Sequence, residues 1–321
     1  MTRYILRRFA LLLLTLVLTS LLVFVIAQVI PGDVCRVILG REAGEAALTN
    51  CRIDLGFVDT EGQPVSAVRR YLSWLGDFLR GDWGTSYATG EEILPWVLGR
   101  LRNTLMLSAV VLVMAIPAAL VFGFIAGLNE SKTADNVISV GSLSVVGLPE
   151  FITAILLINL IAFNVEWIPA NSSIPVDTSF LGALPSLILP ALAATFVILA
   201  YIARQTRAGV IDELKQNYVR TAELKGLPRH KVLTTHIARN ALLPTITVIA
   251  ISIGWLISGL VVIENVFNYP GLGRLMVFAI DRRDLPTLQA CVMISVIGFA
   301  LANLAADLLY AGLNPRIRFG K

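Results

Sequence analysis

Apolar residues in this chain gather in six long blocks that are separated by polar segments. Each block is about twenty residues long or longer, which is the length that a helix needs to cross roughly 30 Å of hydrocarbon. The blocks lack the alternation of a barrel strand and are about twice as long as one. The sequence therefore predicts an all-α, polytopic membrane protein with six transmembrane helices. The predicted helices cover residues 9–30, 104–128, 137–163, 183–203, 245–263 and 288–310.

The first block follows Arg3, Arg7 and Arg8, as the apolar core of a secretory signal would. Its apolar stretch exceeds the about 7–15 residues that are usual for a signal. We therefore expect a retained membrane anchor.

Composition agrees with a membrane protein. Hydrophobic residues make up 56% of the chain and charged residues 15%, whereas a soluble domain carries about 25% charged residues.

The distribution of Lys and Arg predicts the orientation, because these residues favour the cytoplasmic side. Fifteen of them fall on the side of both termini, and three fall in the short segments of the other side. The N- and C-termini are thus predicted to be cytoplasmic.

The first external segment, residues 31–103, contains two of the three cysteines, Cys35 and Cys51. A disulfide between them is chemically permitted outside the cytoplasm. Two unpaired thiols are the alternative, because the sequence gives no Cα separation.

Apolar residues from Tyr71 to Leu79 recur at helical spacing and predict an amphipathic helix. Such a helix would lie on the membrane surface, receive a delivery protein, or simply pack on the bundle.

The internal segment 204–244 carries a helical pattern that Gly226, Leu227 and Pro228 interrupt. Gly226 suits a helix C-cap, where φ is positive, and Pro228 suits the first turn of the next helix. Two short helices joined at a bend are predicted.

This segment resembles a known family. The run YVRTAELKGL at 218–227, with His236 and the run RNALLP at 239–244, is similar to the coupling motif of bacterial ABC importer permeases. The triplet RTA at 220–222 stands where most of the family has Glu-Ala-Ala, as is usual in the dipeptide, oligopeptide and nickel permease branch. Three other stretches resemble the same branch, in particular its first permease type with a large first external loop. They are RYILRR at 3–8 with IPGD at 30–33, VIENVF at 262–267 with PGLG at 270–273, and DLLY at 307–310 with NPRIR at 314–318.

The resemblance implies a type I ABC importer permease architecture: a single transmembrane domain over 1–321, with the external loop 31–103 and the coupling loop 204–244 as subregions. It implies docking of the coupling loop on two separate ATPase subunits or domains, which bind ATP and Mg. The expected docking residues are Ala222, Glu223, Lys225, Gly226 and Arg229. Further implied partners are a second permease of similar size, an extracytoplasmic substrate-binding protein and the lipid bilayer of the bacterial plasma membrane, but no nucleic acid.

The sequence predicts no catalytic or metal site. The only Gly-Lys pair is Gly320-Lys321, so a Gly-x-x-x-x-Gly-Lys phosphate loop is absent from the sequence. The two histidines, His230 and His236, lack the i, i+4 spacing of a metal pair. We therefore expect no enzyme, no cofactor of its own, and a transporter subunit powered by a partner. A self-contained secondary transporter or channel is the alternative.

Substrate identity depends on weaker signals. Glu150 is an acidic residue inside the third block, beside Pro149, and such a residue usually faces the bundle interior or a water-filled cavity. Glu150 is predicted to line the substrate path, unless it lies near the helix end and extends to the interface. Peptides are favoured over nickel, because no cluster of His, Cys or carboxylates marks a metal path.

Overall fold

The computed structural model describes residues 2–29, 34–40, 42–59, 61–175 and 178–313. The predicted motif at 314–318, the run at 30–33 and the end of the first predicted block at Ile30 lie outside these ranges. Apart from two isolated β-bridges, the secondary structure of the described part is helical. The all-α prediction is therefore confirmed. The helices in chain order are α1 (Thr2–Val29), α2 (Val34–Leu39), α3 (Glu45–Asp54), α4 (Ala67–Arg80), α5 (Ile93–Leu128), α6 (Thr133–Gly147), α7 (Glu150–Leu157), η1 (Ile158–Ala162), α8 (Phe180–Leu214), α9 (Asn217–Leu224), α10 (Arg229–Lys231), η2 (Val232–Ile237), α11 (Ala238–Ser258), α12 (Val261–Val266), α13 (Leu272–Asp281) and α14 (Leu285–Leu313).

Five helices in the described part are long and apolar enough to cross a membrane, and a bent pair of helices gives a sixth candidate. The five are Ile5–Gln28, Ile93–Leu128, Phe180–Leu214, Arg229–Ser258 and Leu285–Leu308. They overlap five of the six predicted blocks, so the count of six spans holds when the bent pair is taken as one.

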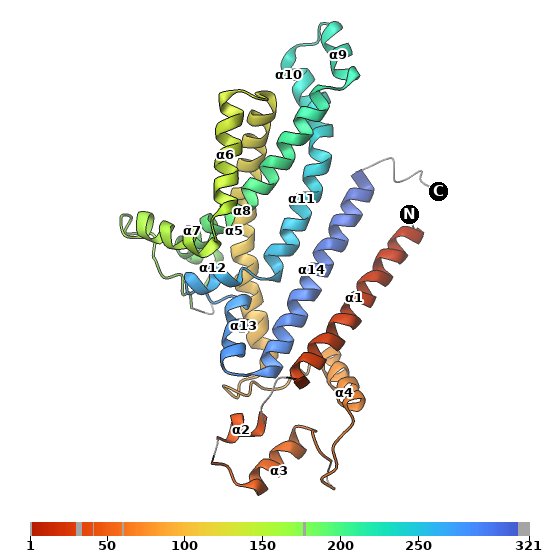
Figure 1. Cartoon of the computed structure of the whole chain (residues 1–321), viewed down its shortest axis with the longest axis vertical. Helices are drawn as coiled ribbons and strands as arrows, with labels where there is room; N and C mark the ends of the chain where they lie inside the picture. Colours follow the sequence, from red (N-terminus) through yellow and green to blue (C-terminus); the bar gives the residue numbers. More distant parts are fainter. Residues whose placement is uncertain (1, 30–33, 41, 60, 176–177, 314–321) are drawn as a thin grey trace.

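The bent pair corrects the prediction for residues 137–163. The structure contains α6, then a break, then α7 continued by the π-helix η1, with an angle of 104° between the two parts. The break follows from Pro149, because proline disfavours helical backbone at the residue before it. Leu148 accordingly has φ −87° and ψ 131°, in the extended region. In Figure 1, α7 runs sideways from the lower end of α6 instead of continuing it.

Three helices extend well beyond the predicted apolar blocks. The helix α5 begins at Ile93, and α8 continues to Leu214. The helix that contains α11 begins at Arg229 and passes through Pro244. The predicted forty-residue internal loop is therefore mostly the outer ends of two long helices, because hydropathy records where a helix leaves lipid, not where it ends.

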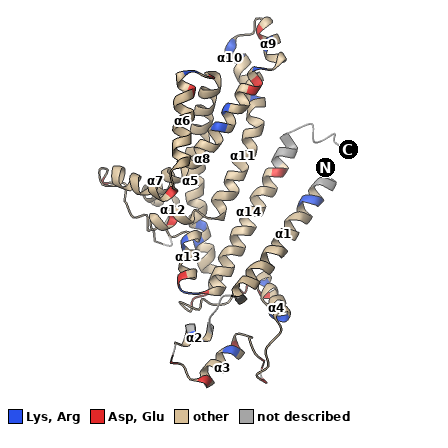
Figure 2. Ribbon diagram, in the orientation of Figure 1, with Lys and Arg blue, Asp and Glu red and all other residues tan. Residues whose placement is uncertain are grey.

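The main buried core lies between α5, α7, α8, α12 and the end of α11. The most extensive contact joins α5 to α8, while α11 packs on both α8 and α14, and α1 lies against α14. A close approach between α8 and α11 requires Gly209, since a Cβ there would overlap the carbonyl oxygen of Ala241. The N-terminal end of α1 and the C-terminal end of α14 lie toward the same side as α9 and α10, opposite α2, α3 and α4 (Figure 1). Charged residues concentrate at these two sides of the bundle (Figure 2).

The segment between α1 and α5 forms a small layer on the side opposite α9. A disulfide joins Cys35 on α2 to Cys51 on α3, with a Cα separation of 5.8 Å. The helix α4 covers the end of α1. The Tyr71 hydroxyl lies 2.8 Å from the Ser20 hydroxyl, and the Tyr71 ring packs edge-on against Phe24 at 5.4 Å. The predicted amphipathic helix is thus present and packs on the bundle.

Candidate functional site

Residues 215–231, here named the elbow, form the outermost part of the side that carries α9 (Figure 1). The chain leaves α8 at Leu214, makes the eight-residue helix α9, turns, and enters the next long helix at Arg229. The bend predicted at Gly226 is therefore present. It joins the ends of α8 and the helix that leads into α11.

The turn of the elbow has the geometry of a Schellman cap. The Gly226 amide donates to the Glu223 carbonyl at 2.9 Å, and the Leu227 amide donates to the Ala222 carbonyl at 3.3 Å. Gly226 has φ +72°, in the left-handed region that glycine adopts at no steric cost. Nothing lies within 4 Å of the position that a Cβ would take there. Backbone conformation, not crowding within the chain, is therefore what selects glycine.

An apolar cluster fixes the elbow to the bundle. It is contributed by α8, α9 and the first turns of the helix that begins at Arg229, and Leu227 of the turn packs against it. Burial of this cluster makes the elbow part of the bundle and not a free loop. Its buried members are Val210, Val219, Ala222, Val232, Ile237 and Ala241.

The structure divides the five predicted docking residues between two faces. Glu223, Lys225, Gly226 and Arg229 are exposed on the outer face of the elbow. Ala222 is only 7% exposed and packs inward, behind the face that carries the other four. The reason is the helical period of α9, which places Ala222 three residues after the buried Val219.

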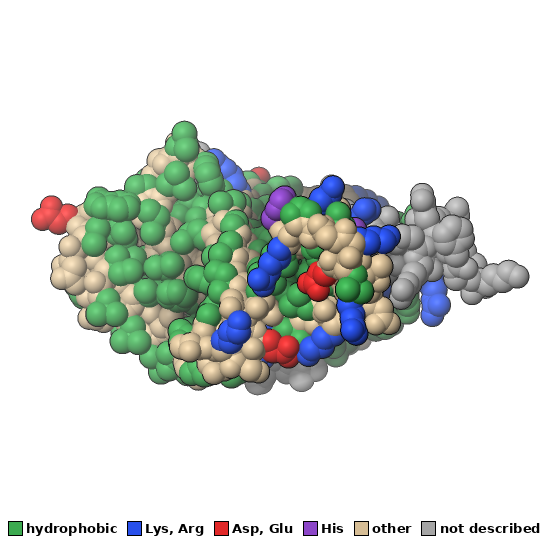
Figure 3. Space-filling view, turned by 90° about the horizontal axis from the view of Figure 1, so that it is seen from above, with side chains coloured by type: hydrophobic (Ala, Val, Ile, Leu, Met, Phe, Trp, Pro, Cys, Tyr) green, Lys and Arg blue, Asp and Glu red, His purple; other side chains and the backbone are tan. Residues whose placement is uncertain are grey.

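Leu224 is the residue of the elbow that sequence reasoning missed. It is 82% exposed, more than any other large apolar side chain among the described residues. Its position could have been found from the period of α9, since it lies two residues after the inward Ala222. Figure 3, viewed onto this end of the molecule, shows Lys and Arg side chains gathered around apolar ones. The outer face thus combines one exposed apolar side chain, Leu224, with surrounding Lys and Arg side chains.

Tyr218, on α9, links the end of α8 to the start of α11. Its hydroxyl donates to the carboxylate of Glu213 at the end of α8 and accepts a hydrogen bond from Asn240 Nδ2 at 3.0 Å. Burial, together with the bond to Glu213, raises the pKa of Tyr218 above its ordinary value. The phenol therefore stays protonated and holds α8 and α11 at a fixed separation.

A partly buried ion pair joins α6 to α8 near the same end. Arg207 donates to Asp135 through Nε at 2.5 Å and Nη2 at 2.7 Å, and the Asp135 side chain is 2% exposed. The Asp135 carboxylate also accepts from the Ser131 amide at 2.9 Å and the Ser139 hydroxyl at 3.1 Å. With these bonds satisfied, the pair fixes α6 to the helix that carries the elbow. Sequence reasoning missed it because no local spacing relates residues 135 and 207.

Glu150 lies at the break in the third span. It is the first residue of α7 and is half-buried, with Pro149 as the residue before the helix. It is therefore distant in the chain from the elbow and belongs to a different part of the fold (Figure 1).

A second buried carboxylate, Glu264, was not singled out from the sequence. It is 0% exposed, accepts from the Thr104 hydroxyl at 2.7 Å, and accepts from the Arg274 amide at 3.0 Å. Thr104 in turn accepts from the Leu272 amide at 2.8 Å. These bonds satisfy amides at the start of α13 and join it to α5 and α12. Within the described residues, no group of three His, Cys, Asp or Glu side chains is placed to hold a metal ion.

Comparison with known families places this architecture. The family described as "binding-protein-dependent transport system inner membrane component" matches residues 119–319, which include the elbow and Glu264. A second family, the N-terminal part of such membrane components, matches residues 1–108. The chain belongs to the binding-protein-dependent transport system inner membrane component family. The resemblance to ABC importer permeases stated from the sequence is therefore confirmed, and the chain is a multi-pass membrane permease component.

Individual permeases align with this chain along nearly their whole length. The probable peptide ABC transporter permease protein y4tP of Sinorhizobium fredii is 33% identical over 316 residues, covering 98% of this chain and 99% of y4tP. The glutathione transport system permease protein GsiC of Pectobacterium atrosepticum is 34% identical over 319 residues, covering 99% of this chain and all of GsiC. GsiC of Escherichia coli K12 is 33% identical with the same coverage.

Proposed function

We propose that this permease is one of two membrane-spanning subunits of an ATP-driven importer of di- or oligopeptides. The observation that carries the proposal is the elbow, a rigid turn closed by Gly226 that presents Leu224 to solvent within a basic rim. An exposed apolar side chain surrounded by charges suits a protein interface, where apolar anchors supply affinity and charged groups fix register. Membership of the permease family supports a separate ATPase as the protein that binds there.

The proposed ATPase contact uses the outer face of the elbow. Leu224 enters a cleft of the ATPase, while Glu223, Lys225 and Arg229 pair with charges on its rim. Movement of the ATPases on binding and hydrolysing ATP and Mg is then passed to α8 and α11. Tyr218 and the Asp135–Arg207 pair keep α6, α8 and α11 together during that movement. The chain itself holds no ATP and no cofactor in this mechanism.

The proposed substrate path lies between this chain and a second permease of similar size. Broken helices at membrane depth are tolerated where they line a cavity or a protein interface. The 104° break between α6 and α7 fits such a place. Glu150, at the break, would face the path and attract the amino end of a peptide. Large apolar side chains exposed on α7 and η1, including Phe151 and Leu160, would meet the second permease or lipid.

The substrate class rests on the relatives. One aligned permease is named for peptides and two for glutathione, itself a short peptide. A substrate-binding protein would deliver the peptide on the side opposite the elbow. We place that side outside a bacterial plasma membrane, because the ends of α1 and α14 share the elbow side with most of the Lys and Arg residues.

Reconstitution tests this function. Vesicles containing the chain with its second permease, ATPases and binding protein should accumulate labelled tripeptide only when ATP and Mg reach the ATPases. The chain alone should catalyse no uptake. Gradient-driven uptake by the chain alone would instead support a secondary transporter and would contradict the proposal.

A further inference from the structure

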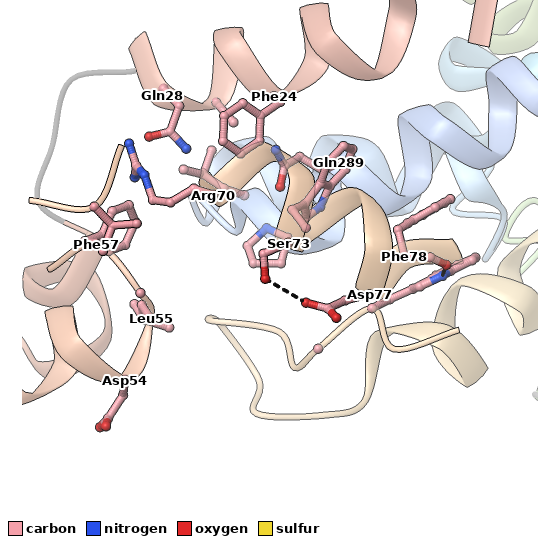
Figure 4. Close-up of a pocket in the computed structure, with 18 of the residues that line it drawn as sticks. Phe24, Gln28, Asp54, Leu55, Phe57, Arg70, Ser73, Asp77, Phe78 and Gln289 are labelled. Carbon is pink, nitrogen blue, oxygen red and sulfur yellow. Dashed lines mark hydrogen bonds between the residues drawn. The ribbon is translucent and has the colours of Figure 1, made fainter. Parts of the chain in front are cut away.

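A pocket of about 810 Å³ lies on the side opposite the elbow, between the end of α1, the helix α4, residues 53–59 and the start of α14. This volume is within the range of about 300–1,000 Å³ found for small-ligand sites. Figure 4 shows the pocket, with Phe24 on α1, Phe57 below it and several side chains of α4 facing it. Neither the elbow nor Glu150 lines this pocket.

One face of α4 forms the longest wall. Its pocket-lining residues recur at intervals of three and four, the spacing of a single helix face. The helix is well anchored, since Ser66 accepts from the Arg69 amide at its start and Trp74 packs on Phe24 at 5.9 Å. The wall is therefore rigid. Its residues are Arg69, Arg70, Ser73, Trp74, Asp77 and Phe78.

Arg70 supplies a positive end to the pocket. Its guanidinium lies over the Phe57 ring at 5.1 Å, and its buried Nε has no hydrogen-bond partner among the described residues. The ion pairs found in the described part of the chain do not include Arg70. A planar guanidinium with free donors matches a carboxylate in two-point geometry.

Asp77 supplies a negative end. It is held only by bonds at the limit of length, from the Ser73 hydroxyl at 3.4 Å and from Arg80 at 3.4 Å. Two other acids of the pocket are engaged by backbone amides, and the third, Asp54, is directed away from the other labelled residues in Figure 4. Asp59 accepts from Glu61 and Gln63, and Asp82 accepts from Gly84. Asp77 is therefore the carboxylate best placed to receive an ammonium group.

The distance between the two ends defines the ligand. Arg70 and Asp77 lie seven residues apart on one helix face, which corresponds to about 10.5 Å along the axis. An extended peptide spans at most about 3.3–3.6 Å per residue, so a tripeptide reaches roughly that length. Between the ends, the half-buried Trp74 offers aromatic surface for an apolar side chain, and Phe78 packs beside it.

We propose that this pocket binds a short zwitterionic peptide, with the terminal carboxylate on Arg70, the terminal ammonium on Asp77 and a side chain on the aromatic wall. The choice of a peptide rests on the proposed function. The pocket would hold peptide at the entrance side of the permease, apart from the path between subunits.

The test measures binding of the tripeptide Ala-Phe-Ala to the full chain in lipid nanodiscs by calorimetry. Quenching of tryptophan fluorescence is a second readout, because Trp74 and Trp83 line the pocket. Amidation of the peptide carboxyl should weaken binding by about tenfold or more, the usual effect of losing a hydrogen-bonded charge. Acetylation of its amino group should also weaken binding. The dipeptide Ala-Phe should bind less tightly, because it cannot reach both ends.

Variants assign these effects to residues. Arg70→Gln should weaken binding of the free peptide to the level of the amide and abolish the preference between them. Arg70→Lys should keep part of the preference, and Asp77→Asn should abolish the preference for a free amino group. Arg282→Gln is the matched control, an exposed arginine of the same side that does not line the pocket. Thermal unfolding would check that each variant is folded.

Three results would overturn the proposal: no binding at millimolar peptide, equal binding of free and amidated peptide by the unaltered chain, or an undiminished preference in folded Arg70→Gln. The first two need no variant. The assay also needs no ATPase. ATP-driven uptake without this binding would remove the pocket proposal alone, and binding without ATP-driven uptake would remove the proposed transport function alone.

Discussion

The hydroxyl of Thr104 donates to the buried carboxylate of Glu264, 160 residues further along the chain, with an oxygen–oxygen distance of 2.7 Å. The same carboxylate accepts from the Arg274 amide, so two donors from two elements depend on one side chain. Glu264 therefore connects α5, α12 and α13.

Replacing the buried Glu264 should lower the free energy of unfolding more than replacing an exposed glutamate would. Glu264→Ala leaves buried donors without partners, at a cost of about 1–3 kcal/mol each. Glu264→Gln keeps one acceptor and should cost less. Thermal unfolding in detergent measures both. Glu166→Gln, at an exposed position, is the control and should leave the transition unchanged. Equal stability of Glu264→Ala and the unaltered chain would show that this network is unimportant.

Leu224 should act as the apolar anchor of the elbow. Leu224→Ala should reduce ATPase association by about tenfold or more, in line with the loss of a central apolar contact. Pull-down of the ATPase and uptake in vesicles measure the effect. Leu79→Ala, which alters a leucine that is 77% exposed on α4, should leave both unchanged. Cross-linking from Leu224→Cys to the ATPase would locate the contact directly.

Gly226 should be required for its backbone conformation. Gly226→Val forces a β-branched residue toward positive φ and should uncouple ATP hydrolysis from peptide uptake while leaving membrane insertion intact. Gly226→Asn should retain much of the coupling, because asparagine tolerates the left-handed region. The ratio of ATP hydrolysed to peptide accumulated is the measurement. If Gly226→Asn is as defective as Gly226→Val, close approach of the ATPase backbone, and not φ, is the requirement.

Asp135 and Arg207 should contribute to stability jointly, so that removing one charge costs more than removing both. Arg207→Met leaves the buried Asp135 carboxylate uncompensated and should destabilise the protein by about 3–5 kcal/mol. The double replacement Asp135→Leu with Arg207→Met should recover much of that loss, since both charges are then removed. Thermal unfolding of Asp135→Leu, Arg207→Met and the double variant gives the coupling. Additive losses would mean that the two side chains act independently.

The disulfide should be detectable without disrupting the bundle. Under non-reducing conditions, a thiol reagent should label neither Cys35 nor Cys51, and reduction should expose both. Cys291 is free but buried, so it should react only after denaturation. Mass-tagged maleimide and electrophoresis distinguish these states. Labelling of two cysteines before reduction would show that the bridge is absent.

Apolar blocks predicted most of the fold, because lipid requires a helix wherever a long apolar stretch crosses it. The bend at Gly226 was also predictable, since a helix C-cap and the following Pro228 are local signals. The 104° angle of the break at Pro149 could not be predicted from the sequence. A proline within a long apolar block is compatible with a kink or with a sharp turn, as the intact α8 with Pro185 and Pro190 illustrates.

The buried polar contacts could not be predicted from the sequence. Asp135 and Arg207, or Thr104 and Glu264, are brought together by helix packing, and no spacing in the chain relates them. The inward position of Ala222 was not predicted for a simpler reason, because motif membership identified the segment but not which face of α9 each residue occupies. The charged ends of the pocket on α4 required the positions of α1 and α14 as well.

The unbroken run of α8 has a mechanical consequence. Its 35 residues form a rod of about 52 Å, which spans the bundle from the turn after Ser179 to the elbow. Rotating such a rod by about 5° around one end displaces the other by roughly 4–5 Å. That displacement is close to the about 4.8 Å thickness of an extended polypeptide. A rotation of this size about the α9 end would therefore move the opposite end of α8 by about the width of one peptide chain.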